Sequence, residues 1–147
     1  MKRAIIVKGR SKVGKSSIIY QCYDWIIKHY TVTHLITPST WMDGTVQEIK
    51  AIIQVGRLVI GICSAGDEQS TVDKHLDDCM MHSCDIIIGA CRTRGGTFNT
   101  VRSRLSYPNY ITEWCIPEWI APAGKMSTRI RIGADELKAR LTALPKL

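Results

Sequence analysis

Residues 4–16 of this chain are Ala4-Ile5-Ile6-Val7-Lys8-Gly9-Arg10-Ser11-Lys12-Val13-Gly14-Lys15-Ser16, and they carry the strongest indication of its fold. The apolar run at its start predicts a short buried strand. From Ser16 to His29 apolar residues recur every three or four positions, which predicts an amphipathic helix that buries one face against a sheet. A complete G-x-x-x-x-G-K-S loop therefore lies between a predicted strand and a predicted helix.

The loop has the composition of a phosphate-binding site. Gly9 and Gly14 allow backbone angles and close approaches that a β-carbon would prevent, so successive amide groups can turn toward phosphate oxygens. The N-terminus of the helix adds partial positive charge. Lys15 can reach the outer phosphates, and the Ser16 hydroxyl can ligate the Mg²⁺ that bridges them. The nucleotide-contacting residues that we expect are Gly9, Arg10, Ser11, Lys12, Val13, Gly14, Lys15, Ser16 and Ser17.

On this motif the chain resembles the P-loop NTPase superfamily, over about residues 4–29. The resemblance implies a three-layer α/β fold that binds a nucleoside triphosphate with Mg²⁺. In the branch that includes partitioning and cell-division ATPases, a lysine follows the first glycine and reaches across a dimer. Arg10 stands at that position here, which departs from the branch pattern and leaves open a homodimer that uses Arg10 in trans.

Length and composition predict one ordinary globular domain over residues 1–147. The hydrophobic fraction of 45% and the charged fraction of 22% are typical of soluble domains. No apolar run approaches the roughly 20 residues that a membrane helix needs, and the amino terminus shows no secretory signal. We therefore expect a cytoplasmic chain without a membrane partner. The cysteines form no C-x-x-C pair and are expected to be reduced core residues: Cys22, Cys63, Cys79, Cys84, Cys91 and Cys115.

The formal net charge is +7 at pH 7. This charge permits a nucleic-acid partner, but no block of basic residues and no nucleic-acid-binding motif supports one. A protein partner also stays open.

Two apolar runs in the middle of the chain predict an antiparallel hairpin. They cover Glu48–Gln54 and Leu58–Cys63, and Gly56 would supply the turn between them. A helix over Thr45–Ile53 is the alternative. Before this hairpin we expect a short strand at Thr33–Ile36, followed by turns at Thr37–Thr40 and at Asp43-Gly44.

The remaining chain alternates predicted helices and strands. This alternation predicts a mostly parallel sheet with helices on both faces, in which ligands bind beyond the carboxyl ends of the strands. The predicted elements are a helix at Glu68–Ser83, a strand at Asp85–Ala90, a helix at Thr97–Leu105, a strand at Tyr110–Ile116, a loop at Pro117–Pro122 and a closing helix at Ala134–Ala143.

Candidate catalytic groups follow two of the buried strands. Asp67 could contact Mg²⁺ or a metal-bound water, or it could cap the following helix. Glu68 could orient or deprotonate a water. Arg92 and Arg94 could neutralise charge on a transferred phosphoryl group or bind an acceptor phosphate. We expect Asp85, at the entering end of its strand, to be structural, and we expect Arg102 and Arg104 to be solvated surface residues.

A second cluster has metal-ligand spacing. His75, Cys79 and His82 would share one side of a helix, with Cys84 just beyond, and could hold zinc. The alternative, which the apolar pattern favours, is a core stripe made of Val72, Leu76, Cys79, Met80 and Ser83.

Three functions fit these observations. The first is an NTPase whose hydrolysis cycle drives a conformational or partner-binding switch, with Lys15, Ser16, Asp67 and Glu68 at its centre. The second is a small-molecule kinase that uses Arg92 and Arg94 at the acceptor. The third is a non-catalytic nucleotide sensor or basic adaptor. ATP is favoured over GTP because the guanine-selecting N/T-K-x-D pattern is absent from the sequence.

Overall fold

A computed structural model of the chain describes residues 2–120 and 125–144. Its centre is a seven-stranded sheet with the order β2-β4-β5-β6-β1-β7, in which β3 also pairs with β4. The strands are β1 Lys2–Lys8, β2 Val32–His34, β3 Ser39–Asp43, β4 Val46–Val55, β5 Leu58–Cys63, β6 Ile86–Cys91 and β7 Tyr110–Cys115. The helices are α1 Lys15–His29, α2 Gln69–Met81, α3 Gly96–Arg104, α4 Pro117–Ile120 and α5 Met126–Thr142.

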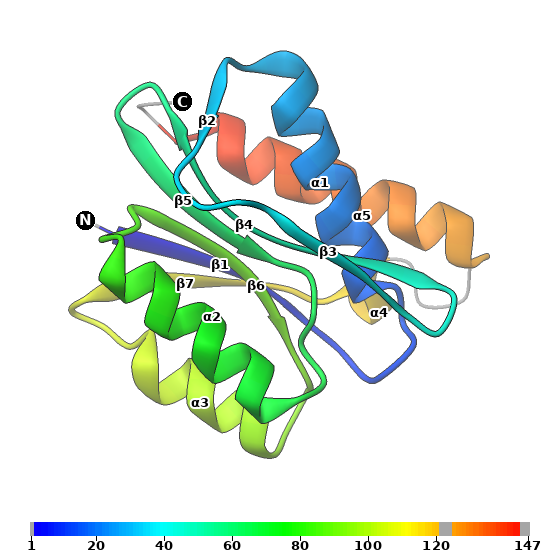
Figure 1. The fold of residues 1–147 in the computed structure, drawn as a ribbon. Helices are drawn as coiled ribbons and strands as arrows, with labels where there is room; N and C mark the ends of the chain where they lie inside the picture. The colour runs from blue at the N-terminus through cyan, green and yellow to red at the C-terminus, as the bar shows by residue number, and fades with distance from the viewer. Residues whose placement is uncertain (1, 121–124, 145–147) are drawn as a thin grey trace.

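Helices cover both faces of the sheet, so the fold has three layers (Figure 1). Alternate residues of β1 enter different cores because successive side chains of a strand point to opposite faces. Ile5 and Val7 belong to the core beneath α1 and α5, whereas Ala4 and Ile6 belong to the core beneath α2 and α3. The predicted α/β architecture with helices on both faces is confirmed.

The sheet has a parallel half and an antiparallel half. β5, β6, β1 and β7 are parallel neighbours, and β4 pairs antiparallel with β5, β2 and β3. The prediction of a mostly parallel sheet is therefore wrong, since three strand pairs are parallel and three are antiparallel. The physical reason is that tight turns at Gly44 and Gly56 reverse the chain before and after β4, so both β3 and β5 run antiparallel to it.

The predicted hairpin is confirmed, and the alternative helix over Thr45–Ile53 is wrong. Val55 of β4 pairs with Leu58 of β5, and Gly56 between them takes a left-handed φ of +60°. A second hairpin precedes it: β3 pairs with β4 from Asp43↔Val46 onward, with a turn at Gly44. The turn predicted at Thr37–Thr40 is thus wrong at its end, because Ser39 begins β3.

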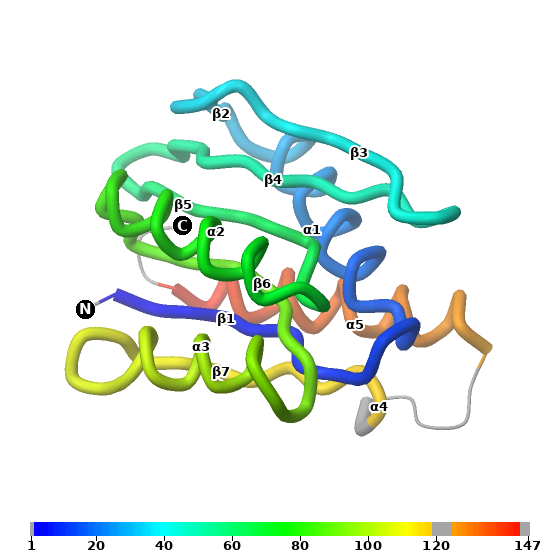
Figure 2. Tube along the Cα trace, turned by 60° about the horizontal axis from the view of Figure 1, so that its bottom comes forward, coloured from blue at the N-terminus to red at the C-terminus, as the bar shows by residue number. Residues whose placement is uncertain are grey.

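Most other elements match their predicted positions within a few residues, and two differ. Pro117–Ile120 forms the short helix α4 where a loop was predicted, and Ala121 and Pro122 lie outside the described residues. The closing helix α5 begins at Met126 rather than Ala134. Figure 2 shows α4 beside the chain that follows β1, and Glu118 of α4 accepts a hydrogen bond from Arg10 N there.

The six cysteines are buried and free, as predicted for reduced core residues. On α2 the predicted core stripe holds for Val72, Leu76 and Cys79, whereas Met80 is exposed and Ser83 follows the helix at the surface. None of the helices in the described part of the chain has the length and apolarity to cross a membrane.

Candidate functional site

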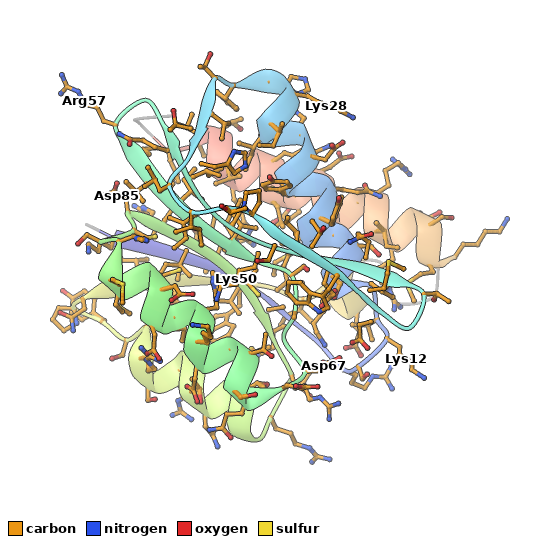
Figure 3. The ribbon with its side chains drawn as sticks, in the orientation of Figure 1. Lys12, Lys28, Lys50, Arg57, Asp67 and Asp85 are labelled. Carbon is orange, nitrogen blue, oxygen red and sulfur yellow. The ribbon has the colours of Figure 1, made fainter. Side chains whose placement is uncertain are left out.

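Three loops meet at the carboxyl edge of the parallel strands. They follow β1, β5 and β6, which lie next to one another as β5-β6-β1. Figure 3 shows Lys12 and Asp67 at this edge, and Asp85 and Arg57 at the opposite edge. The predicted convergence of these loops is confirmed, and Asp85 lies away from it, where its Oδ2 accepts a hydrogen bond from Val59 N at 2.9 Å.

The loop after β1 has an unusual backbone. Gly14, the residue before α1, has a φ of +100°, which a side chain would disfavour. Lys12 has a φ of +63°, which costs a non-glycine residue about 1–2 kcal/mol. Gly9 N donates to Cys91 O at 3.1 Å and ties the loop to β6. No described side chain caps the first turn of α1, so its backbone N–H groups face the loop without a competing acceptor.

Lys15 places its ammonium group inside this loop. Its side chain is only 5% exposed. Nζ donates to Gly9 O at 2.7 Å, to Arg10 O at 2.8 Å and to Asp67 Oδ1 at 3.0 Å. Two loop carbonyls and one carboxylate therefore hold the charge of Lys15 at the N-terminus of α1.

Asp67 connects the loop after β5 to the other two loops. Besides Lys15, its Oδ2 accepts from Ser11 Oγ at 3.4 Å, and its Oδ1 lies 3.5 Å from Arg92 Nε. The alternative role as a helix cap is wrong, because Glu68 occupies the N-cap position of α2 and no side-chain cap is formed there. Asp67 instead uses its oxygens on cations and a hydroxyl of the neighbouring loops.

Ser16 links the loop after β1 to the antiparallel half of the sheet. Its Oγ donates to Ser64 O at 3.2 Å. The Ser64 hydroxyl in turn accepts a hydrogen bond from Ile49 N of β4 at 2.8 Å. The first turn of α1, the end of β5 and the start of β4 are thus connected through polar contacts.

Glu48 of β4 is a buried carboxyl group that the sequence reasoning missed. The residue is 2% exposed, and among the described residues its Oε1 has no hydrogen-bond partner. Burial raises the pKa of Glu48, and the nearby hydroxyls of Ser16 and Ser64 act in the opposite direction. One signal was available: Glu48 is an acidic residue in the mostly apolar run Glu48–Gln54, which the sequence predicts as a strand.

Glu48 lies in the wall of a pocket of about 250 Å³ between the two halves of the sheet. Trp41, Met42 and Asp43 of β3 form one side of this pocket. The remaining lining residues are Ser16, Ala65, Gly66, Asp67, Glu68 and Thr71. Predicted site residues from the first turn of α1 and from the loop after β5 therefore share the pocket with β3 and β4, which contributed no predicted site residue.

Glu118 of α4 is a second group that was missed. Its Oε1 accepts from Arg10 N at 3.2 Å, and its Oε2 accepts from Arg10 Nε at 3.0 Å. Because it falls in a proline-rich stretch predicted as loop, no sequence signal connected Glu118 with Arg10.

The predicted arginines separate into two groups. Arg92 and Arg94 are exposed in the loop after β6, and of these Arg92 reaches Asp67. Arg104 instead pairs with Asp73 and Asp77 of α2, away from the loop that follows β1. Arg102 is exposed on α3. The structure thus brings Arg92 and its loop to the site and leaves the helix pair outside.

The alternative zinc cluster on α2 is packed against the sheet. His75 Nε2 lies 3.1 Å from Ile88 O, and Cys79 Sγ lies 3.6 Å from His75 Nδ1. Burial lowers the pKa of His75 to about 4. Within the described residues, no three His, Cys, Asp or Glu side chains gather in a way that could hold a metal ion by themselves.

Comparisons with protein-family models, with curated proteins and with solved structures found no match for this chain.

Proposed function

We propose that the chain is an Mg²⁺-dependent NTPase that binds ATP at residues 9–17 and uses its hydrolysis to drive a conformational or partner-binding switch. One observation carries the proposal: the buried ammonium group of Lys15 lies within the loop at the uncapped N-terminus of α1. A lysine that is oriented before binding, beside free helical N–H groups, matches the charge and geometry of a polyphosphate. An uncharged ligand would gain no charge interaction with this ammonium group.

Residues from the three loops have separate roles in the proposed reaction. The backbone from Gly9 to Ser17 holds the phosphates, and Lys15 shifts from the loop carbonyls to the outer phosphates. When bound, Mg²⁺ neutralises charge on the phosphate oxygens; Ser16 would hold it, and Asp67 would contact it or one of its waters. Glu68, at the rim of the pocket, orients a water and accepts its proton. Arg92 and Arg94 stabilise negative charge from the loop after β6.

In the reaction, the oxygen of the water forms a bond to the γ-phosphorus while the bond to the β–γ bridging oxygen breaks. ADP leaves with that electron pair, and the water's proton passes to a base or to the released phosphate. The pocket next to Ser16 favours water over an anionic acceptor, because Asp43, Glu48, Asp67 and Glu68 all line it. A nucleoside monophosphate placed there would meet like charges. This argues for hydrolysis rather than for a nucleotide kinase.

The experiment is incubation of the purified chain with γ-labelled ATP and Mg²⁺, with and without a panel of nucleoside monophosphates. We expect label in free phosphate in every sample. Label on a monophosphate would replace the proposal by the kinase, and ATP binding without turnover would replace it by the sensor.

Lys15→Ala tests the site itself. We expect a loss of turnover of about 100-fold or more, because a fixed charge that stabilises the transition state disappears. Lys28→Ala is the matched control: Lys28 is an exposed lysine near the other end of α1, paired with Asp24, and should retain full activity. Activity of Lys15→Ala close to that of the wild type would refute the site assignment.

A further inference from the structure

Two of the buried cysteines lie side by side where α2 ends, at the edge of the sheet opposite the loop after β1. Cys79 is near the end of α2, and Cys84 follows the helix just before β6. The next residue, Asp85, marks this edge in Figure 3. A β-carbon at Gly61 of β5 would collide with Cys79 Sγ and lie 3.2 Å from Cys84 Sγ. The two sulfur atoms therefore share the space over one glycine.

The end of α2 also brings the backbones of these two cysteines together. Cys84 N donates to Cys79 O at 3.0 Å, and Ser83 between them has a left-handed φ of +51°. Helices commonly end in this arrangement, which places the two outer side chains in contact. The hydrogen bond keeps the two Cα atoms within about 7 Å, which is the outer limit for a disulfide. A bond between the sulfur atoms therefore requires rotation of the side chains and no large movement of the backbone.

His75 of α2 supplies a proton acceptor beside this pair. Its Nε2 lies 3.1 Å from Ile88 O, and because a carbonyl oxygen can only accept, Nε2 carries the ring proton. Nδ1 is then an acceptor, and it lies 3.6 Å from Cys79 Sγ. Burial lowers the pKa of His75 to about 4, so the ring is neutral at neutral pH. Two thiols and a basic ring nitrogen thus form one buried group.

The two thiols of the pair differ in acidity. The hydrogen bond from Cys79 lowers the pKa of Cys84; burial opposes this effect, and the positive charge of Lys2 adds to it. The same hydrogen bond raises the pKa of Cys79. Because the thiolate is the form of cysteine that attacks an oxidant, Cys84 is the more reactive member. Cys79 is then the thiol that can complete a disulfide.

We propose that Cys79 and Cys84 are a site of reversible oxidation, at which a hydroperoxide converts the two thiols into a disulfide. The Cys84 thiolate attacks one peroxide oxygen: an S–O bond forms, the O–O bond breaks, and the leaving oxygen takes the proton that Cys84 released on ionising. Cys79 Sγ then attacks the sulfur of this sulfenic acid and passes its proton to His75 Nδ1. The S–O bond breaks, and the departing hydroxide takes that proton and leaves as water. The two sulfurs lose two electrons, which the peroxide gains.

The test treats the purified, reduced full chain with hydrogen peroxide, alkylates the remaining thiols in denaturant and digests the chain with trypsin without reduction. Trypsin releases residues 75–92 as one peptide, which holds Cys79, Cys84 and Cys91. In mass spectra we expect this peptide to lose two hydrogen atoms and to carry one alkyl group, on Cys91, and a dithiol should reverse the loss. Three alkyl groups on the treated peptide, or a disulfide that includes Cys91, would overturn the proposal.

Cys22 is the control within the same sample. It belongs to the core beneath α1 and α5, and burial raises its pKa to about 12. We expect Cys79 and Cys84 to lose their free thiols about tenfold faster than Cys22, or more, because only the pair contains an activated thiol. Equal rates for all three cysteines would mean that oxidation follows general unfolding of the chain, and the pair would then be no site.

His75→Gln tests the proton acceptor. Glutamine can still donate to Ile88 O, but it has no basic nitrogen. We expect the disulfide to form about tenfold more slowly or less, and we expect the Cys84 sulfenic acid, trapped with dimedone, to accumulate. His29→Gln, at an exposed histidine of α1, should form the disulfide at the rate of the wild type. Wild-type kinetics in His75→Gln would overturn the role of His75. These measurements need no nucleotide, so the inference does not rest on the proposed NTPase function.

Discussion

The parallel and antiparallel halves of the sheet present their charged groups to the shared site in different ways. At the edge of the parallel half, the charged groups pair with one another: Lys15 with Asp67, Asp67 with Arg92, and Arg10 with Glu118. From the antiparallel half comes Glu48, which is more deeply buried than any of these carboxylates and has an unpaired oxygen. The paired charges therefore stabilise the fold, whereas Glu48 destabilises it.

This difference has a functional meaning. A paired charge is held in position and can change its partner. In the proposed function, Lys15 would replace its loop carbonyl acceptors by phosphate oxygens. A buried carboxyl group with one unpaired oxygen costs the fold about 1–3 kcal/mol, which is the pattern expected where function and stability conflict. The two halves should therefore respond in opposite directions to the same kind of substitution.

The largest expected effect comes from matched substitutions by methionine at the two positions. Lys15→Met should lower the free energy of unfolding by about 2 kcal/mol or more, because Gly9 O, Arg10 O and Asp67 lose a donor. Glu48→Met should raise it by about 1 kcal/mol, because an apolar chain of similar size replaces an unsatisfied carboxyl group. Urea unfolding at neutral pH without added metal or nucleotide measures both.

The controls for this pair are Lys28→Met and Glu136→Met, at two partly or fully exposed residues that sit in i,i+4 ion pairs on α1 and α5. Each should change stability by less than about 0.5 kcal/mol. If Lys15→Met and Glu48→Met shift the free energy of unfolding in the same direction, the contrast between the halves is not energetic and Glu48 is an ordinary buried residue.

A smaller effect should appear in the pH dependence of stability. Burial raises the pKa of Glu48, so the folded chain binds a proton there more tightly than the unfolded chain. The resulting stability is fully present below the ordinary pKa of a glutamate and is lost as pH rises through the raised pKa. Measured against Glu48→Gln, the wild type should therefore become relatively more stable as pH falls through this window.

The pH effect of Glu48 is read from the difference in the free energy of unfolding between the wild type and Glu48→Gln, because other residues also titrate. Burial lowers the pKa of His75, so its contribution to the free energy of unfolding is lost as pH falls over the acidic range. The hydrogen bond from Lys50 is the main cause that lowers the pKa of Asp78, so its contribution is lost as pH falls further. Both residues are present in both proteins and cancel in the comparison. A stability difference that does not change with pH would mean that Glu48 has the same proton affinity in both states.

The parallel half is also the half that the sequence predicts well. Apolar runs such as 4–7 and 58–63 become buried strands because they are buried on both faces and carry their own pattern. The loop between Gly9 and Ser16 and the residues after β5 could likewise be placed at one edge, because parallel neighbours end at the same side of a sheet. Local sequence patterns were therefore sufficient to predict the parallel strands and the position of the loops that follow them.

The antiparallel half is predicted only in part: the β4–β5 hairpin follows from two apolar runs around Gly56, whereas β3 and the surroundings of Glu48 follow from no sequence pattern. β3 has the sequence Ser39-Thr40-Trp41-Met42-Asp43, which is largely exposed and becomes a strand through its pairing with β4. The environment of the Glu48 carboxyl group is set by burial and by Ser16 and Ser64, which belong to other segments of the chain. No spacing rule joins these residues, so the buried carboxyl group of Glu48 at the site could not be predicted from the sequence.

The same limit explains the late start predicted for α5. Gly133 within this helix weakens the local helical signal. In the structure a β-carbon at Gly133 would lie 2.5 Å from Ile18 Cδ1, so the glycine permits close packing of α5 on α1. Tertiary packing overrides the local cost and extends the helix back to Met126.

The smallest expected effect concerns the outermost pair of the parallel half, Arg10 and Glu118. If the loop after β1 binds ATP as proposed, Glu118→Ala should tighten that binding about threefold, because the carboxylate that holds Arg10 N and adds negative charge beside this loop is removed. Arg10 is 73% exposed, so the pair is worth less than about 1 kcal/mol to stability, and the gain should shrink at high salt. Glu136→Ala, which breaks an arginine pair on α5, should leave the Kd unchanged. Weaker ATP binding by Glu118→Ala would show that this carboxylate holds the loop in the conformation that binds phosphate and does not compete with phosphate for Arg10. The ion pairs of the parallel half would then stabilise the site as well as neutralise its charges.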